Sequence, residues 1–234
     1  MKVLAIDTAT EACSVALLDG NDVTMRFIEV GRGHADEVLG MVDAVLRESG
    51  VGLRELDGIA ASIGPGSFTG VRICVSVAQG LAFGAGLPVV GVTTLEALAA
   101  QARRAGGEAV LACLDARMGE VYWACHSWAA GHACTTLGAP AVGPPGSVRV
   151  PFGGSFRGIG RGFAAYPELR ALPGLELPTG AAEALPHATD IARLGALLLA
   201  AGRGVDPEAL TPLYVRDNVA LTEAERAALK RQSA

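Results

Sequence analysis

The order of strand-like and helix-like segments in the first hundred residues constrains the fold most strongly. Three apolar, strand-like runs open the chain at residues 2–7, 14–18 and 23–28, and Asp19-Gly20 between the last two is typical of a hairpin turn. Helical spacing of apolar residues over 35–46, 71–84 and 93–104 then alternates with strand-like runs at 58–63 and 88–92. This βββαβαβα order predicts a mixed sheet covered by helices.

A second strand–turn–strand unit follows at residues 109–127, built around the turn 115–119. We therefore divide the chain into a first lobe of residues 1–105 and a second lobe of residues 106–234. A last helix is predicted near residues 191–201. The division leaves open whether this last helix and the tail pack back on the first lobe.

Composition narrows the class of protein. The 234 residues are 50% hydrophobic and 18% charged, with a net charge of −5. No basic run suits direct contact with phosphates, so we expect any contact with RNA to pass mainly through a partner. The five cysteines show no CxxC spacing, and no apolar stretch of about twenty residues looks like a membrane span. We expect a cytoplasmic protein without a membrane role.

The most distinctive string is GPGSFTG, which links the run 58–63 to the helix 71–84. Glycines at such a junction allow a sharp turn, and a hydroxyl side chain there can cap the helix. A helix N-terminus also attracts anions, but the lysine of a P-loop is missing. We interpret the string as a structural loop, whose residues are Gly64, Gly66, Ser67, Thr69 and Gly70.

The first strand ends in Asp7, which is followed by Thr8 and Thr10. An acid and small hydroxyl residues in a hairpin turn can hold a nucleotide's phosphates and its metal-bound water. The same residues can equally form a plain hydrogen-bonded turn. We retain Asp7, Thr8 and Thr10 as a degenerate nucleotide or phosphate site.

The helix over residues 71–84 has two apolar faces, although a helix lying on a sheet needs only one. The second face carries Ile73, Val77, Gly80 and Gly84. It predicts contact either with a neighbouring helix of the same chain or with another subunit. The earlier helix offers a matching strip at Met41 and Ala44, next to Val45.

Catalytic and metal-binding patterns are weak. None of the four histidines stands four residues from another, so neither HxxxH nor HExxH occurs. Ser14, Ser67 and Cys125 have no acid–base partner nearby in sequence. We assign no catalytic residue and no metal ligand.

Several strings together resemble one family. They are MKVLAIDTATEACSVALLDG, GPGSFTGVRI, AQGLAFGAGLPVVGVTTLEAL, LDARMGEVYWA and LYVRDNVA, and they resemble the bacterial TsaB (YeaZ) family. The resemblance spans most of the chain and is weakest over residues 135–185. It implies an actin-like ATPase fold of the sugar kinase–Hsp70–actin type, with two lobes that each hold a mixed sheet flanked by helices.

The resemblance also implies a role in making threonylcarbamoyladenosine at position 37 of tRNAs that read ANN codons. In this family the protein is a non-catalytic subunit that binds its catalytic paralogue TsaD, with the ATPase TsaE joining them. It dimerises through the two helices with the unexplained apolar surfaces, so a homodimer is also expected.

Comparison with TsaD explains why the chain is expected to lack catalysis. TsaD takes metal ligands from an HxxxH helix, and the matching positions here are Thr94 and Leu98. TsaD's glycine-rich adenosine loop has only a poor counterpart in Gly153-Gly154-Ser155. ATP and metal are therefore expected to belong to the partner subunits. The alternatives are a stand-alone actin-fold kinase or transferase and, third, a metallopeptidase.

Overall fold

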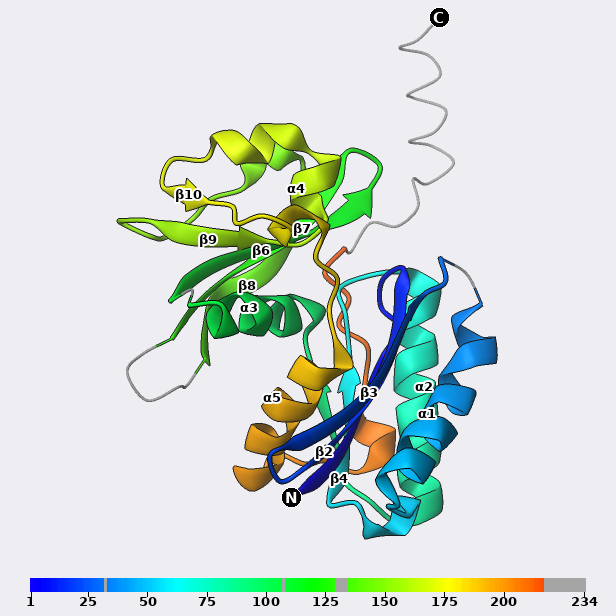
Figure 1. Cartoon of the computed structure of the whole chain (residues 1–234). Helices are drawn as coiled ribbons and strands as arrows, with labels where there is room; N and C mark the ends of the chain where they lie inside the picture. The colour runs from blue at the N-terminus through cyan, green and yellow to red at the C-terminus, as the bar shows by residue number, and fades with distance from the viewer. Residues whose placement is uncertain (32, 107, 129–133, 217–234) are drawn as a thin grey trace, which may run out of the picture.

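A computed structural model of the chain describes residues 1–31, 33–106, 108–128 and 134–216. Within them lie two five-stranded sheets, one in each lobe (Figure 1). The first sheet has the order β3-β2-β1-β4-β5, with β1 Lys2–Asp7, β2 Ala12–Asp19, β3 Asp22–Glu29, β4 Gly58–Ser62 and β5 Val89–Val92. The second has the order β10-β9-β6-β7-β8, with β6 Ala109–Arg117, β7 Glu120–Trp128, β8 Cys134–Gly143, β9 Phe156–Ile159 and β10 Leu175–Glu176.

The two sheets share one topology. In the first, β1, β2 and β3 form an antiparallel meander, while β1, β4 and β5 run parallel. In the second, β6, β7 and β8 form the meander, while β6, β9 and β10 run parallel. The predicted two-lobed architecture with a mixed sheet in each lobe is confirmed.

The helices begin and end where local sequence favours it. They are α1 His34–Ser49, α2 Phe68–Ala85, α3 Thr94–Arg104, α4 Gly162–Ala165 and α5 Ala188–Ala200, with short 3-10 turns η1 Leu53–Glu55, η2 Pro145–Ser147, η3 Pro167–Ala171, η4 Ala181–Glu183 and η5 Pro207–Ala209. Ser67 caps α2, because its side chain accepts a hydrogen bond from the Gly70 N–H. Thr93 and Glu96 form a capping box at α3.

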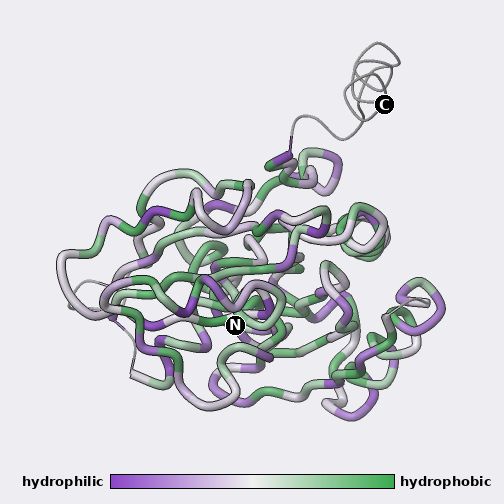
Figure 2. The backbone as a smooth tube through the Cα atoms, turned by 90° about the horizontal axis from the view of Figure 1, so that it is seen from above, coloured by the Kyte–Doolittle hydropathy of each residue, from purple (hydrophilic) through white to green (hydrophobic). Residues whose placement is uncertain are grey.

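Helices cover both faces of the first sheet. Helices α1 and α2 lie side by side on one face, and α5 lies across the other (Figure 1). Helix α5 approaches closely because Gly195 has no side chain: a Cβ there would meet the Cβ of Ala60 at 2.4 Å. The last helix therefore returns to the first lobe. Figure 2 shows long hydrophobic stretches running through the middle of the molecule.

The predicted boundary after residue 105 falls between the two sheets, and α3 lies on its first-lobe side. Leu95, Leu98 and Ala102 of α3 share a core cluster with residues of β6, β7 and β9 in the second sheet. Only Ala97 joins the cluster under α5. The apolar stripe of α3 is visible in the sequence, but the sheet that buries it is not. Arg104 of α3 also forms two 2.9 Å hydrogen bonds to the carboxylate of Asp190 on α5.

Candidate functional site

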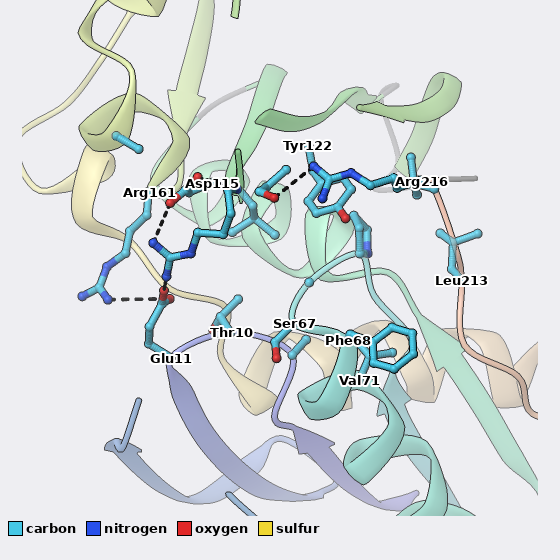
Figure 3. A pocket seen from close by; sticks show the side chains of 18 of the residues that line it. Thr10, Glu11, Ser67, Phe68, Val71, Asp115, Tyr122, Arg161, Leu213 and Arg216 are labelled. Carbon is cyan, nitrogen blue, oxygen red and sulfur yellow. Dashed lines mark hydrogen bonds and ion pairs between the residues drawn. The ribbon is translucent and has the colours of Figure 1, made fainter. Parts of the chain in front are cut away.

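A cleft of about 700 Å³ lies between the lobes (Figure 3). Its first-lobe wall is the β1–β2 turn and the start of α2. Its second-lobe wall is the β6–β7 turn with Arg161 and the end of α4, and the chain segment 213–216 borders one side. This is where an actin-like fold would present the predicted phosphate-binding turn.

Asp7 and Thr8 do not reach this cleft. Both side chains are fully buried, and of the three predicted nucleotide residues only Thr10 lines the cavity. The Thr8 hydroxyl donates to the Gly70 carbonyl at 2.7 Å, and Asp7 Oδ1 accepts from the Ala9 N–H at 2.9 Å. The turn is a hydrogen-bonded structural turn with its acid and first hydroxyl beneath the cleft floor.

The GPGSFTG loop seals that turn, and its glycines make the seal possible. A Cβ at Gly66 would stand 2.2 Å from the Ala9 carbonyl oxygen, and one at Gly70 would stand 2.0 Å from the Thr8 carbonyl oxygen. The Ser67 N–H donates to the Ala9 carbonyl at 2.7 Å. Gly64 has φ of +102°, which favours glycine. Of the two predicted caps Ser67 is the one used, and Thr69 lies exposed in the first turn of α2.

The sealed carboxyl of Asp7 sits in an unfavourable environment for a charge. Burial raises its pKa to about 6, and hydrogen bonds from the Ala9 N–H and the Ser62 side chain oppose this only in part. Asp7 Oδ2 has no hydrogen-bond partner among the described residues. Thr94, at a position matched to a TsaD metal ligand, is buried beside it and shares a 2.9 Å hydrogen bond with the Ser62 hydroxyl.

The other matched position, Leu98, is buried in the core cluster with the second sheet. Neither a threonine hydroxyl nor a leucine side chain replaces an imidazole on a transition metal. Among the described residues, no group of three or more His, Cys, Asp or Glu side chains is placed to hold a metal ion.

Sequence reasoning missed the charged residues of the cleft. Arg117, Arg161 and Arg216 line it, together with Glu11 and Asp115 (Figure 3). Arg117 bonds to Asp115 and to Glu11, and Asp115 also accepts from the Tyr166 hydroxyl at 3.0 Å. The string LDARMGEVYWA contains two of these residues, but nothing in its spacing indicates that they meet a glutamate a hundred residues earlier.

The predicted partner surface is partly wrong on α1. Met41 and Val45 lie in the chain's own core beneath α1, so they have little surface to offer a partner. Ala44 is half-buried and lies one turn before Glu48, which pairs with Arg26 of β3. The side of α1 that carries Ala44 and Glu48 therefore lies toward β3.

On α2 the second apolar face divides between core and surface. Ile73 and Val77 are half-buried against the core that α1 and α2 share. Gly80 and Gly84 are exposed, and a Cβ at either would meet nothing within 4 Å. Phe83 beside them is 83% exposed, and Leu39 on α1 is 54% exposed. The chain's own core therefore accounts for Ile73 and Val77, and contact of Gly80 and Gly84 with another subunit stays a prediction.

By length and composition α2 could also cross a membrane, with a third of its residues buried inside the structure. One such helix is weak evidence, because an apolar helix of a soluble core passes the same test. Cys74, Val75 and Ala78 of α2 lie in the core of the first lobe, so the helix is accounted for as part of that core.

Comparison with known proteins agrees with this architecture. The family described as TsaD, tRNA N6-adenosine threonylcarbamoyltransferase, matches residues 28–144. The tRNA threonylcarbamoyladenosine biosynthesis protein TsaB of Escherichia coli is 42% identical over 224 residues, covering 94% of this chain and 96% of that protein. The YeaZ structure from Pseudomonas aeruginosa is 42% identical with a TM-score of 0.84, covering 91% of this chain and 99% of that one.

A distant structure supports the fold alone. Component A of the Acidaminococcus fermentans (R)-2-hydroxyglutaryl-CoA dehydratase is 10% identical with a TM-score of 0.50, covering 86% of this chain and 99% of that chain. The actin-like two-lobed fold predicted from the sequence is thus confirmed. With the near full-length match to the Escherichia coli protein, these findings show that the chain belongs to the TsaB (YeaZ) family, which acts in tRNA threonylcarbamoyladenosine biosynthesis.

Proposed function

We propose that this protein is a non-catalytic, complex-forming subunit in the modification of adenosine 37 of ANN-decoding tRNAs. It binds TsaD directly, TsaE joins the complex, and ATP and metal are bound by these partners. The complex works in the cytoplasm, and tRNA contacts this chain mainly through its partners. The sealed Asp7 and Thr8 support this proposal, because neither side chain is accessible to a nucleotide from the cleft.

The observation that carries the proposal is the exposed surface of α2. Phe83 stands in solvent between Gly80 and Gly84, which leave room for another backbone. An exposed aromatic side chain beside small residues is typical of an interface. Its burial would stabilise association by roughly 25 cal/mol per Å² of apolar area, before the costs of association.

The similarity of this chain to the TsaD family supports a pseudo-symmetric pair. The match to the TsaD family covers residues 28–144, which include α1, α2 and α3. A partner with the same helices can replace one copy of this chain in a two-fold pair. We therefore propose that the homodimer and the complex with TsaD use the same α2 surface.

Reconstitution tests the proposal. We expect tRNA modification only when this protein, TsaD and TsaE are combined, and none from this protein alone. Asp7→Ala should leave the reconstituted rate unchanged, while the corresponding site of TsaD should remain essential. Modification by this protein alone, abolished by Asp7→Ala, would instead support a stand-alone transferase. Peptide hydrolysis by the isolated protein would support the metallopeptidase alternative.

A further inference from the structure

Ion pairs cross the cleft from one lobe to the other (Figure 3). Arg117 of the β6–β7 turn pairs with Glu11 of the β1–β2 turn, with 2.7 Å between Nη2 and Oε1. Arg161, between β9 and α4, pairs with Glu29 at the end of β3, with 2.9 Å between Nη2 and Oε2. Its Nη1 also lies 3.8 Å from Glu11 Oε2. Both arginines belong to the second lobe, and both glutamates belong to the first.

The second lobe holds Arg117 in place for this contact. Its Nη1 lies 2.8 Å from Asp115 Oδ2, and its backbone N–H donates to Asp115 Oδ1. Arg117 and Met118 both adopt the left-handed backbone conformation, with φ of 62° and 56°. Residues other than glycine rarely adopt it without a compensating contact. The bonds to Asp115 direct the Arg117 guanidinium across the cleft toward Glu11.

The far side of the cleft is bridged by the chain itself. The Leu213 N–H donates to the Ile63 carbonyl of the first lobe at 2.8 Å. Three residues later, Arg216 donates to the Ala116 carbonyl at 3.0 Å and pairs with Glu120 of the second lobe. Residues 213–216 thus link the lobes along the side where they border the cleft.

We propose that Glu11, Glu29, Arg117 and Arg161 form an ionic latch that holds the two lobes closed over the cleft, opposite the link at residues 213–216. Glu11 is shared by both guanidiniums and Glu29 pairs with Arg161, so the four side chains form a network, in which pairing is worth more than in isolated surface pairs. Arg161 is only 27% exposed, so salt screens its pairs less than those of a free surface residue. The latch is independent of the proposed partner surface on α2.

A label-to-label distance in the full chain tests the latch. Spin labels at Arg54→Cys and Glu168→Cys, two exposed sites in opposite lobes, report the separation of the lobes. Cys134→Ser removes the partly exposed native thiol, and the other four cysteines are buried. We expect Arg161→Glu to shift the distance distribution outward and to raise the open population about tenfold. Combining it with Glu29→Arg should return the distribution toward that of the parent.

Matched controls separate the latch from general charge effects. Arg203→Glu changes the net charge equally on an exposed residue that forms no ion pair with the described residues, and it should leave the distances unchanged. If Arg161→Glu fails to fold by circular dichroism, Arg161→Gln and a 1 M salt titration of the parent apply the same test. An unchanged distribution in these variants and at high salt, or a charge swap that restores nothing, would overturn the latch.

Discussion

The two turns that face each other across the cleft occupy the same position in their sheets but differ in the burial of their acidic residue. Each follows the first strand of its sheet's meander, and each carries an acid, Asp7 in the first lobe and Asp115 in the second. Asp7 is fully buried beneath the GPGSFTG loop, whereas Asp115 lines the cleft and bonds to Arg117 and Tyr166. The same position in a repeated topology is thus closed in one lobe and open in the other.

The difference comes from what packs on each turn. Gly66 and Gly70 let the start of α2 lie directly against the carbonyls of the first turn. In the second lobe the glycines beside α4, Gly160 and Gly162, approach Cys113 of β6 instead, and Met118 at the tip of the turn is exposed. A topological repeat therefore does not imply a repeated site, because the close glycine contacts fall on the turn in one lobe and on the strand before the turn in the other.

The largest expected effect comes from breaking the seal. Gly70→Ala would place a Cβ 2.0 Å from a backbone oxygen that cannot move aside cheaply. We expect the free energy of unfolding to fall by about 3 kcal/mol or more. Gly80→Ala in the same helix meets open space and should instead stabilise by up to about 1 kcal/mol. Urea denaturation measures the free energies of unfolding of both variants. Equal values for Gly70→Ala and Gly80→Ala would contradict the close packing of α2 on the first turn.

The next effect concerns the sealed acid. Because the folded pKa of Asp7 is about 6, above its ordinary 3.8, folding favours the protonated form. The parent should therefore lose stability relative to Asp7→Asn as pH rises from about 4 through about 6, reaching a deficit of about 3 kcal/mol above pH 7. We would measure the free energies of unfolding of the parent and of Asp7→Asn at pH 4.5 and pH 8, which are roughly the two ends of this range. A parent at least as stable as Asp7→Asn at both pH values would refute the account.

The smallest effect probes the open turn. Met118 has φ of 56° and an exposed side chain with few contacts to lose. Met118→Gly should stabilise the fold by about 1 kcal/mol, because glycine adopts this conformation without the steric cost. Thermal unfolding provides the measurement, with Gly119→Ala, at φ of 78°, as the opposing control that should destabilise. A drop in melting temperature for Met118→Gly would show that the turn is not strained.

Much of the fold could be predicted because it follows from local patterns. The hairpin, the alternation of strand and helix and the cap at Ser67 are all encoded within a few residues. Helix α3 was grouped with the first lobe although it packs on the second sheet, because periodicity identifies an apolar stripe but not the sheet that covers it. The burial of Met41 and Val45 was missed for the same reason, since the sequence does not show which strands and helices lie beneath α1.

The candidate site was harder to predict. The latch joins Glu11 to Arg117 and Glu29 to Arg161, pairs more than a hundred residues apart with no local signature. Phe83 was overlooked on α2, although its exposure is the feature a partner would recognise. The tail predicted over residues 213–218 includes Asp217 and Asn218, which lie outside the described residues.

The proposed partner surface is tested most directly by the affinity of TsaD for this protein with a charge placed on α2. Gly84→Arg adds a long cation where nothing lies within 4 Å, so the fold should survive. Val77→Asp is less informative, because Val77 also packs against the core. A charge buried at the interface without a partner should weaken binding about a hundredfold.

Isothermal titration calorimetry with TsaD makes the comparison, and Gly153→Arg, at an equally open glycine of the second lobe, is the control. We expect the parent and Gly153→Arg to bind with the same affinity and Gly84→Arg to bind about a hundredfold more weakly while keeping the parent's circular dichroism spectrum. A folded Gly84→Arg variant that binds TsaD as tightly as the parent would contradict the assignment of α2 as the partner surface.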